Sequence, residues 1–178
     1  DVTKDYRGMK IEVAGQFRSY NRHEGTKNKL VLSIFVRELR FIEEDEMPEE
    51  QSKSNQIFLD GFVCKPPIYR KTPLGREIAD VLVAVNRPYG KSDYIPCIAW
   101  GRNARFCENV AVGTEVRIVG RVQSREYEKK HEDGTVEKID YDEEAIFILF
   151  DSMQTPRAIA LRAAKKLEKI QDKIERFS

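Results

Sequence analysis

The sequence predicts a mainly β protein whose centre is a closed five-stranded barrel carrying one short helix. The first observation is a series of segments rich in β-branched and aromatic residues, bounded by glycine and proline turns, between residues 57 and 150. The second is a single helical interruption at residues 101–110, between the third and fourth of these segments. The third is the acidic stretch 43–56, whose high charge and low hydrophobicity separate an N-terminal strand pair from the barrel.

The barrel elements follow in order. Residues 57–64 form the first expected strand, and residues 65–75 are expected to be a loop because three prolines cannot join a sheet ladder. Residues 78–86 and 93–100 form a hairpin around a turn at 87–91. Residues 115–127 and 138–150 are the last two strands, with a hairpin tip at 129–135. This order of strands and helix is that of an OB-fold barrel, a known platform for oligonucleotides.

The N-terminal part, residues 1–42, reads as a strand pair that repeats part of the barrel. Residues 8–19 align without gaps on residues 113–124, and both glycines and the final serine coincide. We therefore expect residues 8–42 to form a β-hairpin that resembles the second half of another OB barrel. The alternative is that any two β-hairpins share such a pattern. His23 and His131 occupy matched positions at the two hairpin tips, which favours turn residues over metal ligands.

Residues 154–178 are expected to form an amphipathic helix after the barrel domain, which spans residues 57–153. Thr155 is placed to cap the helix, and Pro156 suits its first position. Apolar residues recur at spacings of three and four, at Ala160, Ala163, Leu167, Ile170, Ile174 and Phe177. This seam is shorter than a coiled coil requires. Two partners stay open for it: the chain's own barrel and another chain.

Charge is strongly patterned although the formal net charge is only +1. Residues 57–131 carry 13 Lys and Arg against 8 Asp and Glu, whereas residues 132–153 carry 1 against 8. Residues 43–56 carry 1 against 6. A basic barrel between acidic segments favours a polyanionic partner. The acidic segments serve equally well as solubilising loops.

Two predicted strands carry the candidate binding residues. Alternation places Tyr94, Pro96, Ile98 and Trp100 on one face of the strand 93–100. Alternation along 115–127 places Val119, Arg121, Gln123, Arg125 and Tyr127 on one face of that strand. Aromatic rings and guanidinium groups on adjoining strands suit a single nucleic-acid strand. The competing interpretation is that Tyr94 and Trp100 fill the core of a small barrel.

Residues 57–150 resemble bacterial single-stranded DNA-binding proteins. The resemblance rests on Ala-Val-Asn-Arg at 84–87, on Trp-Gly at 100–101 and on Gly-Arg-Val-Gln-Ser-Arg-Glu-Tyr at 120–127. It implies that Tyr94, Trp100 and Tyr127 stack on bases. It also implies sequence-independent binding of single-stranded DNA in replication, recombination or repair, and replication or repair proteins as partners. The family's common form has one barrel per chain, whereas the repeat of residues 8–19 in 113–124 suggests a tandem-barrel relative. The family usually ends in an acidic tail, whereas this chain ends in a basic helix.

The remaining site candidates are cations and one further aromatic. Phosphate contacts are expected from the cations on and around the predicted hairpin and strands: Arg121, Arg125, Arg87, Lys91, Arg76 and Arg102. Tyr89, in the hairpin turn, completes the set of DNA-binding candidates.

Other function classes fit the sequence less well. It contains no metal-ligand cluster, no activated serine or cysteine and no glycine loop for phosphate, so neither an enzyme nor a cofactor is expected. Three unpaired cysteines favour a reducing cytoplasm, and no apolar run approaches a membrane span. The alternative function is a protein-interaction module of a replication-restart or conjugative complex with weak DNA binding.

The N-terminal hairpin predicts self-association. An isolated two-stranded hairpin is marginally stable in water, so its apolar face needs a cover. That cover is either the chain's own barrel or another subunit. Because the resembling family assembles barrels by sheet contacts, we expect a homo-oligomer, a dimer or a tetramer.

Overall fold

The computed structural model of the 178-residue chain describes residues 4–42, 55–125, 128–130, 136–138 and 145–175. These residues divide into two compact units, one within residues 1–56 and the other within residues 57–178.

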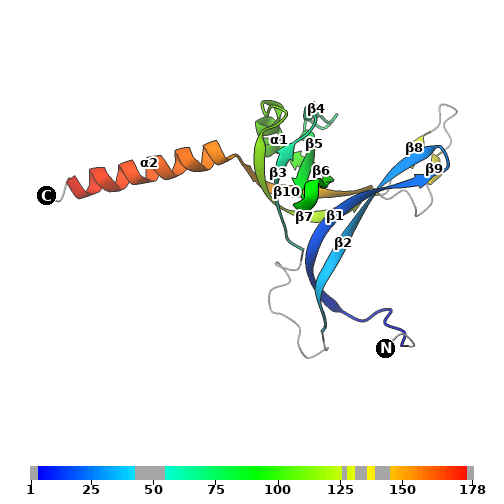
Figure 1. Cartoon of the computed structure of the whole chain (residues 1–178). Coiled ribbons are helices and arrows are strands. Elements are labelled where there is room, and N and C mark those ends of the chain that lie inside the picture. Colours follow the sequence, from blue (N-terminus) through cyan, green and yellow to red (C-terminus); the bar gives the residue numbers. More distant parts are fainter. Residues whose placement is uncertain (1–3, 43–54, 126–127, 131–135, 139–144, 176–178) are drawn as a thin grey trace. The chain divides into compact units, whose positions relative to one another are not determined.

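The second unit is built on a barrel of five strands with one helix (Figure 1). The sheet runs in the order β3, β7, β10, β6, β5, and short pairing between β3 and β5 closes it. Among the strand pairs that the structure describes, only β10 and β6 pair in parallel. The expected mainly β barrel with a short helix is confirmed. Its strands are β3 (Ile57–Val63), β5 (Glu77–Asn86), β6 (Ser92–Trp100), β7 (Glu115–Arg125) and β10 (Ala145–Gln154).

The barrel core follows from strict alternation along the strands. In β3, Ile57, Leu59 and Val63 are buried while the residues between them, except Gly61, are exposed. The helix α1 (Gly101–Glu108) lies against β5 and β6 and buries Ala104 and Cys107. Burial raises the pKa of the Cys107 thiol to about 12, so this cysteine is a neutral core residue.

One predicted loop contains a strand. β4 (Ile68–Lys71) lies inside the segment 65–75 and pairs with β5 at the edge of the sheet. The prediction of a continuous loop is wrong because Pro66, Pro67 and Pro73 all lie outside the four residues of the strand. An edge strand of this length needs few ladder hydrogen bonds, so flanking prolines do not prevent it.

The last hairpin also differs from the prediction. β10 begins at Ala145 and continues to Gln154, so it starts later and ends later than the expected 138–150. A separate short pair, β8 (Glu128–Lys130) and β9 (Val136–Lys138), precedes it. The expected tip residues 131–135, including His131, lie outside the described residues.

The first unit is a long antiparallel hairpin of β1 (Ile11–Glu24) and β2 (Lys27–Phe41). One of its faces is apolar, and several of the side chains on it are about half exposed: Ile11, Ile34, Leu39 and Phe41. On the other face Arg40 forms an ion pair with Glu12, and the Arg18 guanidinium lies 4.0 Å from the centroid of the Phe35 ring. A cation over a ring partly compensates that exposed aromatic surface.

The backbone of this hairpin repeats that of β7 and β10. The aligned glycines Gly8 and Gly113 both have φ of +84°, and each lies in a turn closed by the same type of backbone hydrogen bond. A Cβ on either Gly15 or Gly120, the next aligned pair, would overlap a carbonyl oxygen of the partner strand. Both hairpins carry a β-bulge opposite that glycine. The sequence repeat is therefore a repeat of turn, glycine and bulge.

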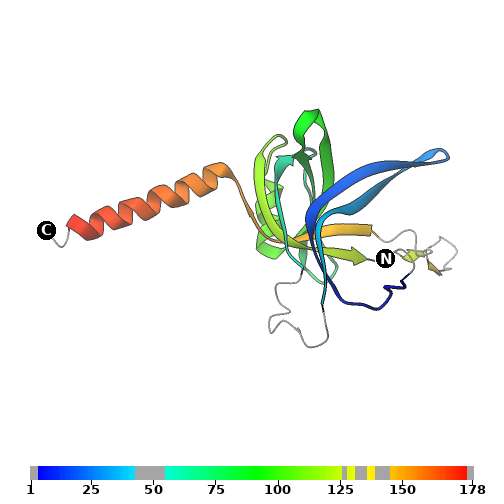
Figure 2. The ribbon, with the colours of Figure 1, turned by 60° about the horizontal axis from the view of Figure 1, so that its bottom comes forward.

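A single helix, α2 (Pro156–Glu175), follows β10 (Figure 2). The Thr155 hydroxyl accepts a hydrogen bond from the Ala158 backbone N–H at 3.1 Å, as expected for an N-cap. Among the described residues, no helix is both long enough and apolar enough to cross a membrane.

Candidate nucleic-acid interface

The aromatic residues of β6 lie on the outside of the barrel. Asp93, Ile95, Cys97 and Ala99 are buried, and the alternate residues point outwards. Tyr94 is 46% exposed and Trp100 is partly exposed. Smaller side chains therefore fill the core, which removes the interpretation of Tyr94 and Trp100 as core residues. We call the outward residues Leu82, Ala84, Tyr94, Pro96, Ile98 and Trp100 the β5–β6 face.

The arginine-bearing strand is not next to the aromatic strand. β10 lies between β6 and β7, so the expectation of adjoining strands is wrong. The register nevertheless connects the two, because Arg121 pairs with Leu149, which pairs with Ile98. Residues that pair directly across strands share a face of the sheet. Arg121 thus continues the β5–β6 face across one intervening strand.

Arg121 is the cation best placed on this face. Its side chain is 47% exposed, and the nearest oxygen of Asp151 lies 3.7 Å from its Nη1. At this distance and exposure the pair holds the guanidinium weakly. A phosphate oxygen can therefore replace the carboxylate.

Arg87 has a different position from the one expected for a phosphate contact. Its guanidinium donates to both carboxylate oxygens of Asp93, at 2.6 Å and 2.7 Å. The Asp93 side chain is only 3% exposed. A buried carboxylate needs such a partner, so we assign Arg87 to the stability of the hairpin. Alternation would have indicated that Asp93 points inwards with Ile95 and Cys97.

The other candidates lie in turns, in the first turn of α1 or at the end of β7. Tyr89 is fully exposed in η3 (Pro88–Gly90), with φ of +67°. Lys91, Arg76 and Arg102 are exposed. Arg125 ends β7, opposite Ala145, and its side chain is outside the described residues, as is Tyr127.

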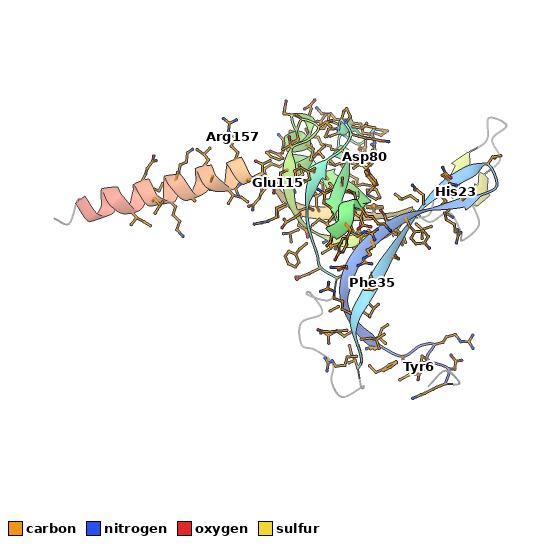
Figure 3. The ribbon with its side chains drawn as sticks, in the orientation of Figure 1. Tyr6, His23, Phe35, Asp80, Glu115 and Arg157 are labelled. Atoms are coloured by element: carbon orange, nitrogen blue, oxygen red, sulfur yellow. The ribbon has the colours of Figure 1, made fainter. Side chains whose placement is uncertain are left out.

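Sequence reasoning missed one charged element on the outer face. Arg70 of β4 forms an ion pair with Asp80 of β5, which is labelled in Figure 3. The Tyr69 hydroxyl donates to Glu77 at 2.8 Å, and Arg105 of α1 lies 2.9 Å from the same carboxylate. The hydrogen bond to Glu77 raises the pKa of Tyr69. The sequence offered one indication of β4: two good strand formers, Ile68 and Tyr69, lie in the proline-free stretch between Pro67 and Thr72.

In the part of the chain that the structure describes, no three His, Cys, Asp or Glu side chains gather in a group suited to a metal ion. The face combines aromatic rings, small apolar residues and a partly screened arginine with the Asp80 carboxylate, which pairs in register with Ile98 and forms an ion pair with Arg70. Bases stack on such rings, and phosphates pair with such cations.

Comparison with known proteins matches the same part of the chain. The model of the Single-strand binding protein family matches residues 54–145, just over half of the chain. Single-stranded DNA-binding protein 3 of Listeria innocua serovar 6a is 38% identical over 84 residues, which cover 42% of this chain and 51% of that protein. Single-stranded DNA-binding protein B of Bacillus subtilis is 36% identical over 86 residues, which cover 43% and 74%.

A solved structure extends the likeness in fold. The single-stranded DNA binding protein from Thermus aquaticus, as a deletion mutant, has a TM-score of 0.64 at 17% identity. The match covers 84% of this chain and 61% of that chain. The present chain spans about half the length of the first relatives in sequence. The barrel, its motifs and the match over residues 54–145 together show that the chain belongs to the single-strand binding protein family.

Proposed function

We propose that the barrel binds single-stranded DNA without sequence preference and without a catalytic step, in replication, recombination or repair. The observation that carries this proposal is the outward position of Tyr94 and Trp100 on a face that Arg121 continues. The names of the related proteins support it, since they are single-stranded DNA-binding proteins.

The binding energy has two sources in this proposal. Stacking on Tyr94, Trp100 and the sequence-matched Tyr127 contributes about 1–3 kcal/mol per base. Phosphate contacts release counterions and make the affinity depend on salt. Arg121 is the central phosphate contact in this proposal. The further proposed contacts to the DNA are Lys91, Arg76, Arg102, Arg125 and Tyr89. Arg87 is left out because its guanidinium already binds Asp93.

A fluorescence titration tests the function. Polythymidine added to the protein should quench Trp100, and log affinity should fall linearly with log salt. Replacing Arg121 by Ala should reduce the magnitude of the slope by about 0.7, the value for one phosphate contact on a single strand. The control is Arg117→Ala, because Arg117 is exposed but forms an ion pair with Asp60 at 2.8 Å.

The proposal fails if Trp100 fluorescence does not respond to polythymidine at low salt. If polythymidine quenches Trp100 but log affinity does not change with log salt, the stacking role would stand and the proposed phosphate contacts would be wrong. Tight binding to a replication protein with weak DNA binding would instead favour the interaction-module alternative.

We further propose that the chain forms a homo-oligomer through the apolar face of β1 and β2. Ile34 and Leu39 on this face are each 51% exposed, and burial of such side chains favours association. Light scattering over a dilution series should show a dimer or tetramer that the double variant Ile34→Glu, Leu39→Glu dissociates. Tyr20→Glu is the control, because Tyr20 is 52% exposed on the opposite face. A wild-type monomer at every concentration would contradict this proposal.

A further inference from the structure

The helix α2 has two distinct faces along its described side chains, one basic and one apolar. At 3.6 residues per turn, Arg162, Lys165, Lys166 and Lys169 fall within an arc of about 100°. All four side chains are exposed. We call these four residues the basic stripe. A second arc is apolar and consists of Ile159, Ala160, Ala163, Leu167 and Ile170.

The basic stripe breaks a local rule of helix stability. Arg162 precedes Lys165 and Lys166 by three and four residues, and Lys169 follows those two lysines by four and three. Like charges at these spacings are neighbours on the helix surface and destabilise it. An ordinary solvated helix face avoids this repulsion by placing carboxylates between the cations.

Neutralisation by nearby carboxylates is not seen. Among the described residues, no carboxylate forms an ion pair with any of the four cations. Glu168 follows Lys165 by three residues and Asp172 follows Lys169 by three, so the sequence places acidic residues beside one edge of the stripe only, on the side of Lys165. A sequence that departs from a local rule in this way commonly does so at a functional site.

We infer that the basic stripe of α2 is a second binding surface for the phosphate backbone of single-stranded DNA. A line of cations with little opposing charge is complementary to a polyanion, which would also relieve the repulsion within the helix. The inference rests on the proposed function of the barrel. The basic stripe follows the barrel face closely in the chain, because α2 begins at Pro156 and β10 ends at Gln154. β10 is the strand that lies between β7, which carries Arg121, and the aromatic strand β6.

A membrane surface fits the same helix less well. Interfacial helices bury large apolar residues below their basic face. Two of the five residues in the apolar arc are alanines, and the bulkier Leu161 lies outside that arc. Arg157, labelled in Figure 3, also lies away from the basic stripe.

The test compares long and short DNA on the full chain. In the stripe variant, Arg162, Lys165, Lys166 and Lys169 are all replaced by Gln. With polythymidine of about 40 nucleotides, which exceeds the ~4–16 that one OB fold occupies, the salt slope should fall in magnitude by about 2–3. Affinity for this oligomer at about 0.1 M salt should fall at least tenfold. With an oligomer of about 10 nucleotides the salt slope should change by less than about 0.7, the value for one phosphate contact.

Two controls accompany this measurement. Arg157→Gln removes one cation from another face of the same helix and should leave the slope of the long oligomer unchanged. Lys166→Gln removes one cation from the stripe and should lower the slope by about 0.7. Circular dichroism should show at least as much helix in the stripe variant as in the wild type, because like-charge repulsion is removed.

The outcomes separate this inference from the function of the barrel. If no oligomer quenches Trp100 in the wild type, the proposed function itself fails. If both oligomers quench Trp100 and the stripe variant keeps the wild-type slope on the long one, only the role of the stripe is overturned. If the stripe variant keeps the wild-type salt slope but loses binding to anionic phospholipid vesicles, the stripe is a membrane contact. The same slope with an altered mass in light scattering would identify a contact between subunits.

Discussion

Replacing Arg87 by Ala should lower the free energy of unfolding by about 3–5 kcal/mol, the cost of removing one partner of a buried ion pair. The reason is that the Asp93 side chain is only 3% exposed and that Arg87 donates to both of its carboxylate oxygens. Removing the guanidinium leaves a charge without its partner inside the barrel. Urea denaturation followed by circular dichroism measures the loss.

Arg117→Ala is the matched control for this change. Arg117 and Asp60 form an ion pair of similar length on the outside of the barrel, where the two side chains are 61% and 65% exposed. Water screens such a pair, so its loss should cost about 1 kcal/mol or less. Equal effects of the two substitutions would show that the Asp93 carboxylate is accommodated without Arg87, and the role assigned to Arg87 would be wrong.

Replacing Trp100 by Ala should weaken the binding of single-stranded DNA by about 1–3 kcal/mol, which is roughly a 5- to 150-fold loss of affinity. Trp100 points outwards from β6 and is partly exposed while Ile95, Cys97 and Ala99 fill the core, which supports the proposal that its ring stacks on a base. Because the variant lacks the tryptophan signal, its affinity is measured by anisotropy of a labelled polythymidine oligomer.

Two further variants make this result interpretable. Trp100→Phe retains a ring and should recover most of the affinity. Phe106→Ala removes an aromatic residue of α1 that is 41% exposed and is not one of the residues of the β5–β6 face, and it should leave the affinity unchanged. Loss of folding in Trp100→Ala, together with unchanged affinity in Tyr94→Ala, would show that the aromatics of β6 stabilise the barrel and do not stack on bases.

The sequence by itself determined the order of the five barrel strands and the short helix, and the faces of those strands. Alternation with period two is local, so Tyr94 and Trp100 were correctly placed opposite Ile95 and Cys97 before any contact was known. The repeat of residues 8–19 in 113–124 was equally local, because Gly8 and Gly113 serve the same backbone conformation at +84°. Thr155 was identified as a cap from its place before Pro156.

Only the tertiary structure decided which strands are neighbours and which charges meet. β10 enters the sheet between β6 and β7, and β3 closes the barrel on β5, through pairings between residues far apart in the chain. The same fold buries the Asp93 side chain and pairs its carboxylate with Arg87, a pairing that alternation along the predicted hairpin does not specify. The physical reason is that alternation specifies a side of a strand, whereas burial of a charge and the choice of its partner depend on the whole barrel around it.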